Sequence, residues 1–148
     1  MKKVTVVIPV FNEEFSIGPL WRKLSNMANV ANHYCWRFIF VDDGSSDGSR
    51  ARLDRLATLE DSVEVICLKR NFGLTQALQA GFDLADGDYV VTIPSNLEYE
   101  PGDIPKIVAE LAGGADICVG SRITSHTKKS TDQPVAQLVN WTISALSG

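Results

Sequence analysis

Short apolar runs alternate along this chain with segments in which apolar residues recur at helical spacing. The runs are rich in β-branched and aromatic residues, which favour strands. They lie at residues 4–10, 38–41, 63–68, 89–93 and 117–119. Between them, apolar residues three and four positions apart predict helices around residues 17–28, 53–57, 74–85 and 104–111. This alternation predicts βαβ crossovers and therefore an α/β fold with a mostly parallel sheet.

The length of 148 residues suits a single domain. We expect the α/β domain to occupy residues 1–122, followed by a polar loop over 123–133. Residues 134–148 have an apolar side at helical spacing and predict a terminal amphipathic helix. That helix would belong to the same domain or be exchanged with a partner chain, so we expect a homo-oligomer.

Polar residues follow the predicted strands at their carboxyl ends. Asp42 and Asp43 come directly after the apolar run 38–41. In an open parallel sheet, ligands bind in the crevice beyond the carboxyl ends of the strands. The alternative is that the two carboxylates only begin a turn, and Asp47 or Ser49 is expected to cap the helix that follows. Two adjacent carboxylates that end a buried strand repel each other, which favours the ligand site.

Composition narrows the function. The net charge of −4 argues against binding to nucleic acid, which needs a basic surface. The three cysteines have no Cys-x-x-Cys spacing, so we expect buried structural thiols in a reducing cytoplasm and neither a disulfide framework nor a zinc site. No apolar run approaches the roughly 20 residues that span a bilayer.

The side chains at the carboxyl ends of the predicted strands suit a nucleoside better than a bare phosphate. The chain has neither the Gly-x-Gly-x-x-Gly pattern nor the P-loop pattern. Its strand ends carry carboxylates, amides and one arginine, at Glu13, Asp42, Asp43, Asn12, Asn71, Gln76, Asn96 and Arg70. Carboxylates and amides match the N–H and O–H groups of a base and a ribose. A diphosphate in so acidic a place normally needs a divalent cation.

Four motifs occur in an order that resembles the family 2 glycosyltransferases. They are Val-Ile-Pro-Val-Phe-Asn-Glu-Glu (7–14), Phe-Val-Asp-Asp-Gly-Ser-Ser-Asp-Gly-Ser (40–49), Arg-Asn-Phe-Gly (70–73) with Ala-Gly-Phe (80–82), and Ala-Asp-Gly-Asp-Tyr-Val (85–90). Within that family, Arg-Asn-Phe-Gly and Gly-Ser-Arg (120–122) are most similar to enzymes that load a sugar onto dolichyl or undecaprenyl phosphate. The resemblance implies the GT-A fold of nucleotide-diphospho-sugar transferases, a doubly wound sheet with helices on both faces.

The same resemblance implies a ligand and its contacts. The ligand would be a UDP- or GDP-linked sugar, transferred with inversion to an acceptor such as a polyprenyl phosphate during synthesis of cell-envelope glycans. Pro9, Phe11, Glu13 and Asp43 would lie in the nucleotide pocket, with Asp42 in contact with the base. Gly73 and Gln76 would flank the nucleotide. The location would be cytoplasmic, peripheral at the inner face of the membrane.

The sequence departs from the family in two places. The family carries Asp-x-Asp after the fourth strand, where its carboxylates hold Mg²⁺ or Mn²⁺. This chain has Pro94-Ser95-Asn96-Leu97-Glu98 there, so Ser95, Asn96 and Glu98 mark a substituted diphosphate and metal region with no confident metal ligand. The family domain also continues into an acceptor-side half that bears the catalytic base, and we expect this chain to be truncated before it.

Two functions remain open on these grounds. One is a glycosyltransferase domain that binds a nucleotide sugar. The other is a non-catalytic nucleotide-binding or assembly module derived from one. No catalytic residue is assigned in either case, and Arg122 is either a phosphate contact or a solvated charge at the end of a strand.

Overall fold

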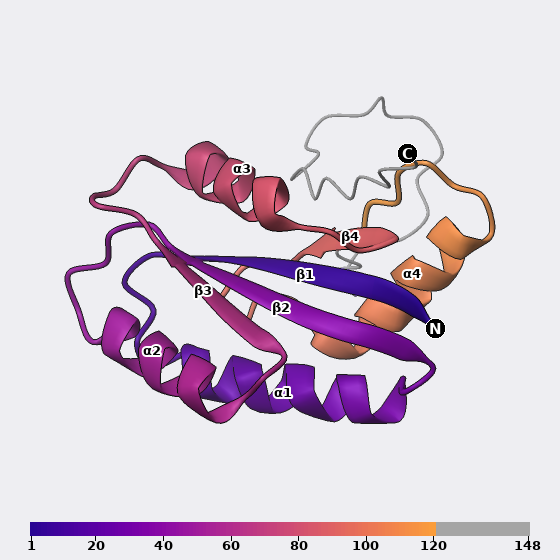
Figure 1. Cartoon of the computed structure of the whole chain (residues 1–148), viewed down its shortest axis with the longest axis horizontal. Coiled ribbons are helices and arrows are strands. Elements are labelled where there is room, and N and C mark those ends of the chain that lie inside the picture. Colours follow the sequence, from indigo (N-terminus) through magenta and orange to yellow (C-terminus); the bar gives the residue numbers. More distant parts are fainter. Residues whose placement is uncertain (121–148) are drawn as a thin grey trace, which may run out of the picture.

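The computed structural model describes residues 1–120, which form a four-stranded parallel sheet with helices on both faces (Figure 1). The strands are β1 (Lys2–Val10), β2 (Tyr34–Asp42), β3 (Val63–Cys67) and β4 (Tyr89–Thr92). The helices are α1 (Ile17–Val30), α2 (Ser49–Leu59), α3 (Leu74–Leu84) and α4 (Ile104–Ala112), preceded by a short 3₁₀ turn, η1 (Pro101–Asp103). This arrangement confirms the predicted fold class.

The order of the strands in the sheet is β3-β2-β1-β4. The chain runs outward from β1 to β3, and α3 then carries it back across β1 and β2 to the far side of the sheet. The direction of winding therefore reverses between β1 and β4. In doubly wound sheets a crevice opens at this switch point, beyond the carboxyl ends of the strands.

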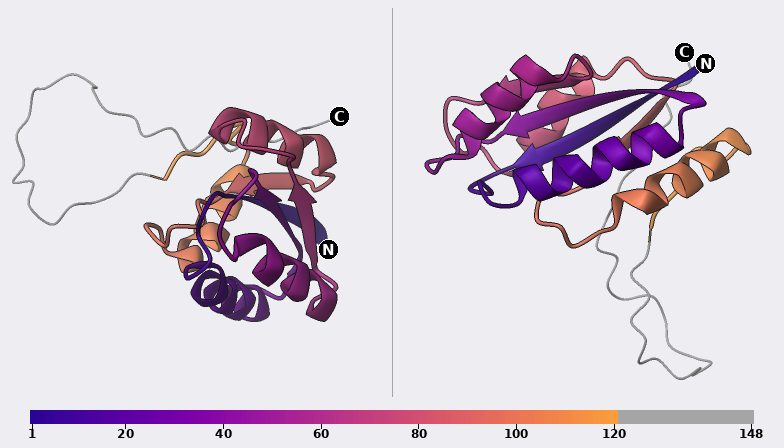
Figure 2. Two further views of the ribbon diagram at one scale, coloured as in Figure 1. Left: turned by 90° about the vertical axis from the view of Figure 1, so that its left-hand side faces the viewer. Right: turned by 90° about the horizontal axis from the view of Figure 1, so that it is seen from below.

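The core has one layer on each face of the sheet because successive side chains of a strand point to opposite faces. One layer packs Val6, Ile8, Phe38 and Phe40 against α1, α2 and α4. The other packs Val7, Ile39, Val41 and Val90 beneath α3. Figure 2 shows this layering from the side, with α3 on one face of the sheet and α1 and α2 on the other.

Helix α3 packs directly against β1 at Gly81. A Cβ at this position would come within 2.3 Å of Val7 Cγ1. The absence of a side chain at residue 81 therefore sets how closely α3 can approach β1, whose carboxyl end leads into the predicted site.

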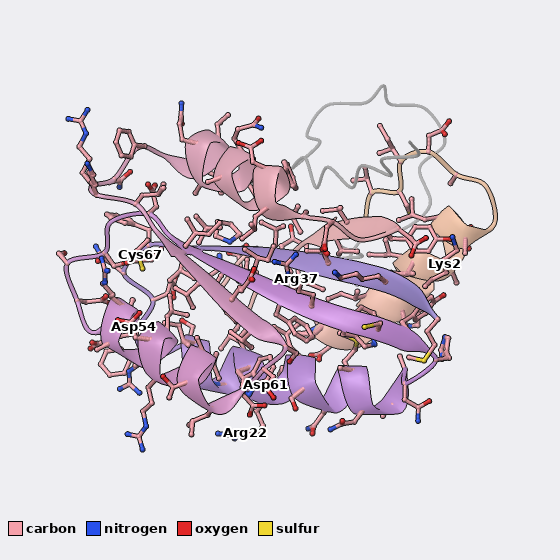
Figure 3. All side chains as sticks on the ribbon, in the orientation of Figure 1. Lys2, Arg22, Arg37, Asp54, Asp61 and Cys67 are labelled. Atoms are coloured by element: carbon pink, nitrogen blue, oxygen red, sulfur yellow. The ribbon has the colours of Figure 1, made fainter. Side chains whose placement is uncertain are left out.

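Ion pairs tie the other end of the sheet together. Lys2 Nζ lies 2.6 Å from Asp88, and Asp86 is bound by both Lys3 Nζ and Arg37, each at 2.6 Å. Arg37 also donates to Glu64. Figure 3 shows Lys2 at this end, Arg37 over the middle of the sheet and Cys67 at the carboxyl end, so the ionic cluster lies away from the carboxyl ends of the strands.

Two expectations are wrong within the described residues. Residues 117–119 form no strand there, and Ile117 and Val119 are exposed. β-branched composition alone does not order a strand, because its backbone groups need a partner strand. The cysteines are free, as expected, but Cys35 is exposed and Cys67 and Cys118 are only partly buried. Cys35 and Cys67 lie at or next to the ends of β2 and β3, and Cys118 lies outside any strand, so all three are less covered than the strand centres.

Three predictions lie outside the described residues: the role of Arg122, the polar loop at 123–133 and the helix at 134–148. Within residues 1–120, no helix is long and apolar enough to cross a membrane.

Candidate functional site

A cavity of about 290 Å³ opens at the switch point, between the carboxyl ends of β1 and β4. Its walls come from four separate segments of the chain. The β1 end contributes Pro9, Val10, Phe11 and Glu13, and the β2 end contributes Asp43. The start of α3 and the turn before it contribute Asn71, Gly73, Leu74 and Ala77, and the turn after β4 contributes Pro94, Ser95 and Asn96. Most of the predicted site residues therefore meet at one cavity.

The loop after β1 is held by the loop after β2. The backbone N–H groups of Asn12, Glu13 and Glu14 donate to Ser45 Oγ at 3.0 Å, Ser49 Oγ at 2.8 Å and Asp47 Oδ2 at 3.2 Å. In return, Asn12 Oδ1 accepts the Ser46 N–H at 2.8 Å and Glu14 Oε2 accepts the Gly48 N–H at 2.7 Å. This network of hydrogen bonds between the two loops fixes the segment that carries Phe11 and Glu13 into the cavity wall.

The N-cap of α2 differs from the one expected from the sequence. Its N-cap residue is Gly48, which has no side chain, so neither Asp47 nor Ser49 occupies the cap position. Asp47 instead supplies the capping contact from one residue earlier, because its Oδ1 accepts the Ser49 N–H at 2.9 Å. Burial would raise the pKa of the Asp47 carboxyl, but hydrogen bonds from Ser49 and Glu14 outweigh it and lower that pKa.

Asp43 fixes the opposite wall of the cavity. Its carboxylate is 4% exposed and accepts two backbone N–H groups, that of Phe72 on Oδ1 at 2.8 Å and that of Gly73 on Oδ2 at 2.9 Å. Gly44, with a φ of +68°, allows the same loop to come close, since a Cβ there would lie 2.3 Å from the carbonyl carbon of Arg70. Asp43 thus both lines the cavity and holds the segment that bears Asn71 and Gly73.

Asp42 does not line the cavity, although it is adjacent to Asp43. It is 1% exposed, and its Oδ1 accepts the Ser45 N–H at 3.1 Å, which closes the turn after β2. Its carbonyl oxygen accepts the Leu68 N–H at 2.8 Å and extends the pairing with β3. The two neighbouring carboxylates therefore serve different segments, and only Asp43 faces the cavity.

The turn after β4 presents neutral groups. Ser95 is 4% exposed, and Asn96 Oδ1 accepts the Glu98 N–H at 3.2 Å. Leu97 adopts a left-handed conformation with a φ of +61°, which is uncommon for a residue with a branched side chain. Glu98 is exposed and does not line the cavity. Of the substituted diphosphate region, Ser95 and Asn96 reach the site and Glu98 does not.

Gln76 is exposed on α3 beside the cavity. Its Oε1 lies 3.6 Å from where a Cβ of residue 73 would be, so it flanks Gly73 without lining the wall. Sequence reasoning did not select Val10, Leu74 or Ala77 for the site, although all three line it. The spacing of Leu74 and Ala77, one turn apart at the start of a helix that follows a polar strand end, was the available signal.

The cavity combines apolar walls with two carboxylates. Phe11 and Leu74 are 44% and 62% exposed, so apolar surface is accessible at the site. Glu13 accepts a hydrogen bond from the Ser16 hydroxyl. Among the described residues that line the cavity none is lysine or arginine, and the guanidinium of nearby Arg70 lies over the Phe72 ring, 4.8 Å from its centroid. Such a cavity suits a flat, uncharged ring that carries N–H and O–H donors.

Comparisons with known proteins agree with this geometry. The family model described as "Glycosyl transferase family 2" matches residues 5–145. The undecaprenyl-phosphate 4-deoxy-4-formamido-L-arabinose transferase of Proteus mirabilis is 38% identical over 150 residues, which cover 100% of this chain and 45% of that protein. The dodecaprenyl-phosphate galacturonate synthase of Rhizobium johnstonii is 38% identical over 122 residues, 81% of this chain and 36% of that protein. The chain thus spans less than half the length of these relatives.

A solved structure shares the fold. It is the mannosyltransferase PcManGT of Pyrobaculum calidifontis in complex with GDP-Man and Mn²⁺, with a TM-score of 0.66 and 22% identity. The match covers 75% of this chain and 32% of that one.

Proposed function

Because this chain belongs to glycosyl transferase family 2, we propose that it binds a nucleotide-diphospho-sugar whose glycosyl group is passed to a polyprenyl phosphate. The observation that carries the proposal is the cavity at the switch point, where Phe11, Glu13 and Asp43 meet the turn after β4. Two relatives that match most of the chain are, by name, a transferase and a synthase of polyprenyl-phosphate sugars, which supports the class of acceptor.

The residues divide the work of binding between them. Asp43 takes the base-side role that the sequence suggested for Asp42, because its carboxylate lines the cavity and can accept an N–H of the base. Glu13, on the adjacent loop, accepts the ribose hydroxyls. Phe11 and Leu74 cover the flat faces of the bound ring with apolar surface.

Two measurements on the full chain test this function. The first is calorimetric titration with UDP and GDP, for which we expect saturable binding of one of the two; no binding of either up to millimolar concentration overturns the proposal. The second is transfer of labelled sugar from the UDP- or GDP-linked donor to undecaprenyl phosphate in detergent micelles. Asp83→Asn, which removes an exposed carboxylate from the far end of α3, is the matched control for an Asp43→Asn variant.

One observation favours the second candidate, a non-catalytic nucleotide-binding module. Pro94 and Asn96 stand at the positions where the family carries its two metal-binding carboxylates. Saturable nucleotide binding without transfer, and without hydrolysis of the sugar nucleotide, identifies this module. Transfer to the lipid phosphate identifies the enzyme.

Three further expectations stay predictions. Arg122 is proposed as a phosphate contact, and self-association is attached to the segment 134–148; both lie outside the described residues. A cytoplasmic position at the inner membrane face follows from the proposed lipid acceptor. Light scattering of the full chain and vesicle flotation with undecaprenyl phosphate measure the last two.

A further inference from the structure

We infer that this cavity binds the nucleoside half of its ligand without a divalent cation, an inference that rests on the proposed nucleotide site. The family implies Mg²⁺ or Mn²⁺ at the diphosphate, and a structure that shares this fold was solved with Mn²⁺ and GDP-Man. The question is whether the side chains present here fit such an ion.

The turn after β4 does not fit it. Hard divalent cations prefer carboxylate oxygens, and this turn brings Pro94, Ser95 and Asn96 to the cavity. Pro94 has no side-chain ligand. Asn96 has one neutral oxygen, and that oxygen already accepts the N–H of Glu98 at 3.2 Å. A cation at this turn would meet no negative charge from the residues that line the cavity there.

The two carboxylates elsewhere in the cavity do not replace the missing pair. Both oxygens of Asp43 accept backbone N–H groups, at 2.8 and 2.9 Å, and Glu13 accepts the Ser16 hydroxyl. Moving Asp43 toward an ion would break the contacts that hold the wall at residues 71–73, and moving Glu13 would break its contact with Ser16. Across residues 1–120, no three His, Cys, Asp or Glu side chains gather closely enough to hold a metal ion.

The same electrostatics separate the nucleoside from the diphosphate. The described lining holds two carboxylates and no lysine or arginine, so it offers a diphosphate no cationic partner. A base and a ribose are uncharged and donate N–H and O–H groups, which both carboxylates can accept. Affinity should therefore depend on the nucleoside and change little as phosphates are added.

Calorimetry of the full chain tests this with two series, uridine, UMP and UDP, and guanosine, GMP and GDP. Each is titrated in EDTA, in Mg²⁺ and in Mn²⁺. We expect the preferred nucleoside to bind in EDTA, its mono- and diphosphate to bind within about tenfold of it, and either ion to change the diphosphate affinity by less than about tenfold. Tightening of the diphosphate by Mn²⁺ or Mg²⁺ beyond tenfold overturns the inference but leaves the nucleotide site intact. Absence of binding by every nucleoside and nucleotide overturns both.

A gain-of-function pair isolates the charge at the turn. Pro94→Asp with Asn96→Asp restores two carboxylates, and Pro94→Asn alone has nearly the same shape at both positions without the charges. Binding of Mn²⁺ alone, followed by loss of the free-ion electron paramagnetic resonance signal, should appear in the double variant and be absent from the unmodified chain and from Pro94→Asn. Far-ultraviolet circular dichroism and urea unfolding verify that both variants fold. Stoichiometric Mn²⁺ binding by the unmodified chain refutes the inference even if neither variant folds.

Discussion

Replacing Asp43 by asparagine should have a larger effect than the same change at Asp42, although the two residues are adjacent. Asparagine has the shape of aspartate but only one side-chain acceptor oxygen. At position 43 the carboxylate accepts two backbone N–H groups, those of Phe72 and Gly73. After the substitution, one of them faces an NH₂ group. The Gly73 N–H also donates to Asn71 Oδ1 at 2.9 Å and keeps that acceptor, so the amide oxygen should turn toward the Phe72 N–H.

The magnitude follows from burial. Hydrogen bonds to a charged group contribute about 1.5–3 kcal/mol each. The substitution removes the one from Gly73 and makes the one from Phe72 a bond to a neutral oxygen. Asp43 is 4% exposed, so removing its charge also returns part of a desolvation cost. We therefore expect Asp43→Asn to lower the free energy of unfolding by about 2–3 kcal/mol. At Asp42 the one hydrogen bond from Ser45 can be kept by the amide oxygen, so the loss should be about 1 kcal/mol or less.

Urea unfolding of the three proteins measures both values, and calorimetry with the preferred nucleoside adds a second readout. Asp43→Asn should weaken nucleoside binding by about 1–3 kcal/mol, because an acceptor and the position of the 71–73 wall are lost together. Asp42→Asn should leave binding within about threefold of the unmodified chain. If Asp42→Asn costs as much stability and affinity as Asp43→Asn, the assignment of the two carboxylates is wrong.

Three other substitutions test the packing and electrostatics of the fold. Thr5 is fully buried, and its Oγ1 has no hydrogen-bond partner in the described structure. Thr5→Val should therefore raise the free energy of unfolding, measured in urea, by about 1 kcal/mol. Destabilisation would show that Oγ1 has a partner. Gly81→Ala places a methyl group 2.3 Å from Val7 Cγ1 and should cost about 1–3 kcal/mol in the same assay, and an unchanged stability would show that α3 can move away from the sheet. The hydrogen bond from Lys3 lowers the pKa of Asp86 below its ordinary value of 3.8. A carboxyl whose pKa is lower in the folded state stabilises the fold above its ordinary pKa, and this contribution is lost as the pH falls through the folded-state pKa. Asp86→Asn should therefore lose less stability than the unmodified chain between neutral pH and pH values below 3.8, and equal losses would exclude this contribution.

The sequence by itself determined the elements that local patterns encode. Residues 38–41 form a strand buried on both faces because four apolar residues in a row leave no polar face to expose. The spacing of Ile17, Leu20, Leu24 and Met27 places one face of α1 in the core. The family motifs added the fold, and the motifs at 7–14, 40–49 and 70–73 contribute residues to the cavity wall.

Only the tertiary structure decided which polar residues face the ligand site. Asp42 and Asp43 are the same residue type and adjacent in the sequence, but Asp42 ends β2 and closes its own turn, whereas Asp43 is the first residue after the strand and lines the cavity. Gly44 shows the same limit, because its role depends on the backbone of Arg70, which is distant in the sequence.

The hydrogen bonds between the loops after β1 and β2, and the absence of a strand at 117–119 in the described structure, have the same physical reason. Asn12, Glu13 and Glu14 find their partners more than thirty residues along the chain, at Ser45, Ser49 and Asp47. Residues 117–119 have the composition of a strand but form none within the described structure. The spacing of hydrophobic residues is a local property of the sequence. A hydrogen bond between loops or the pairing of a strand in a sheet forms only when segments distant in the sequence come together.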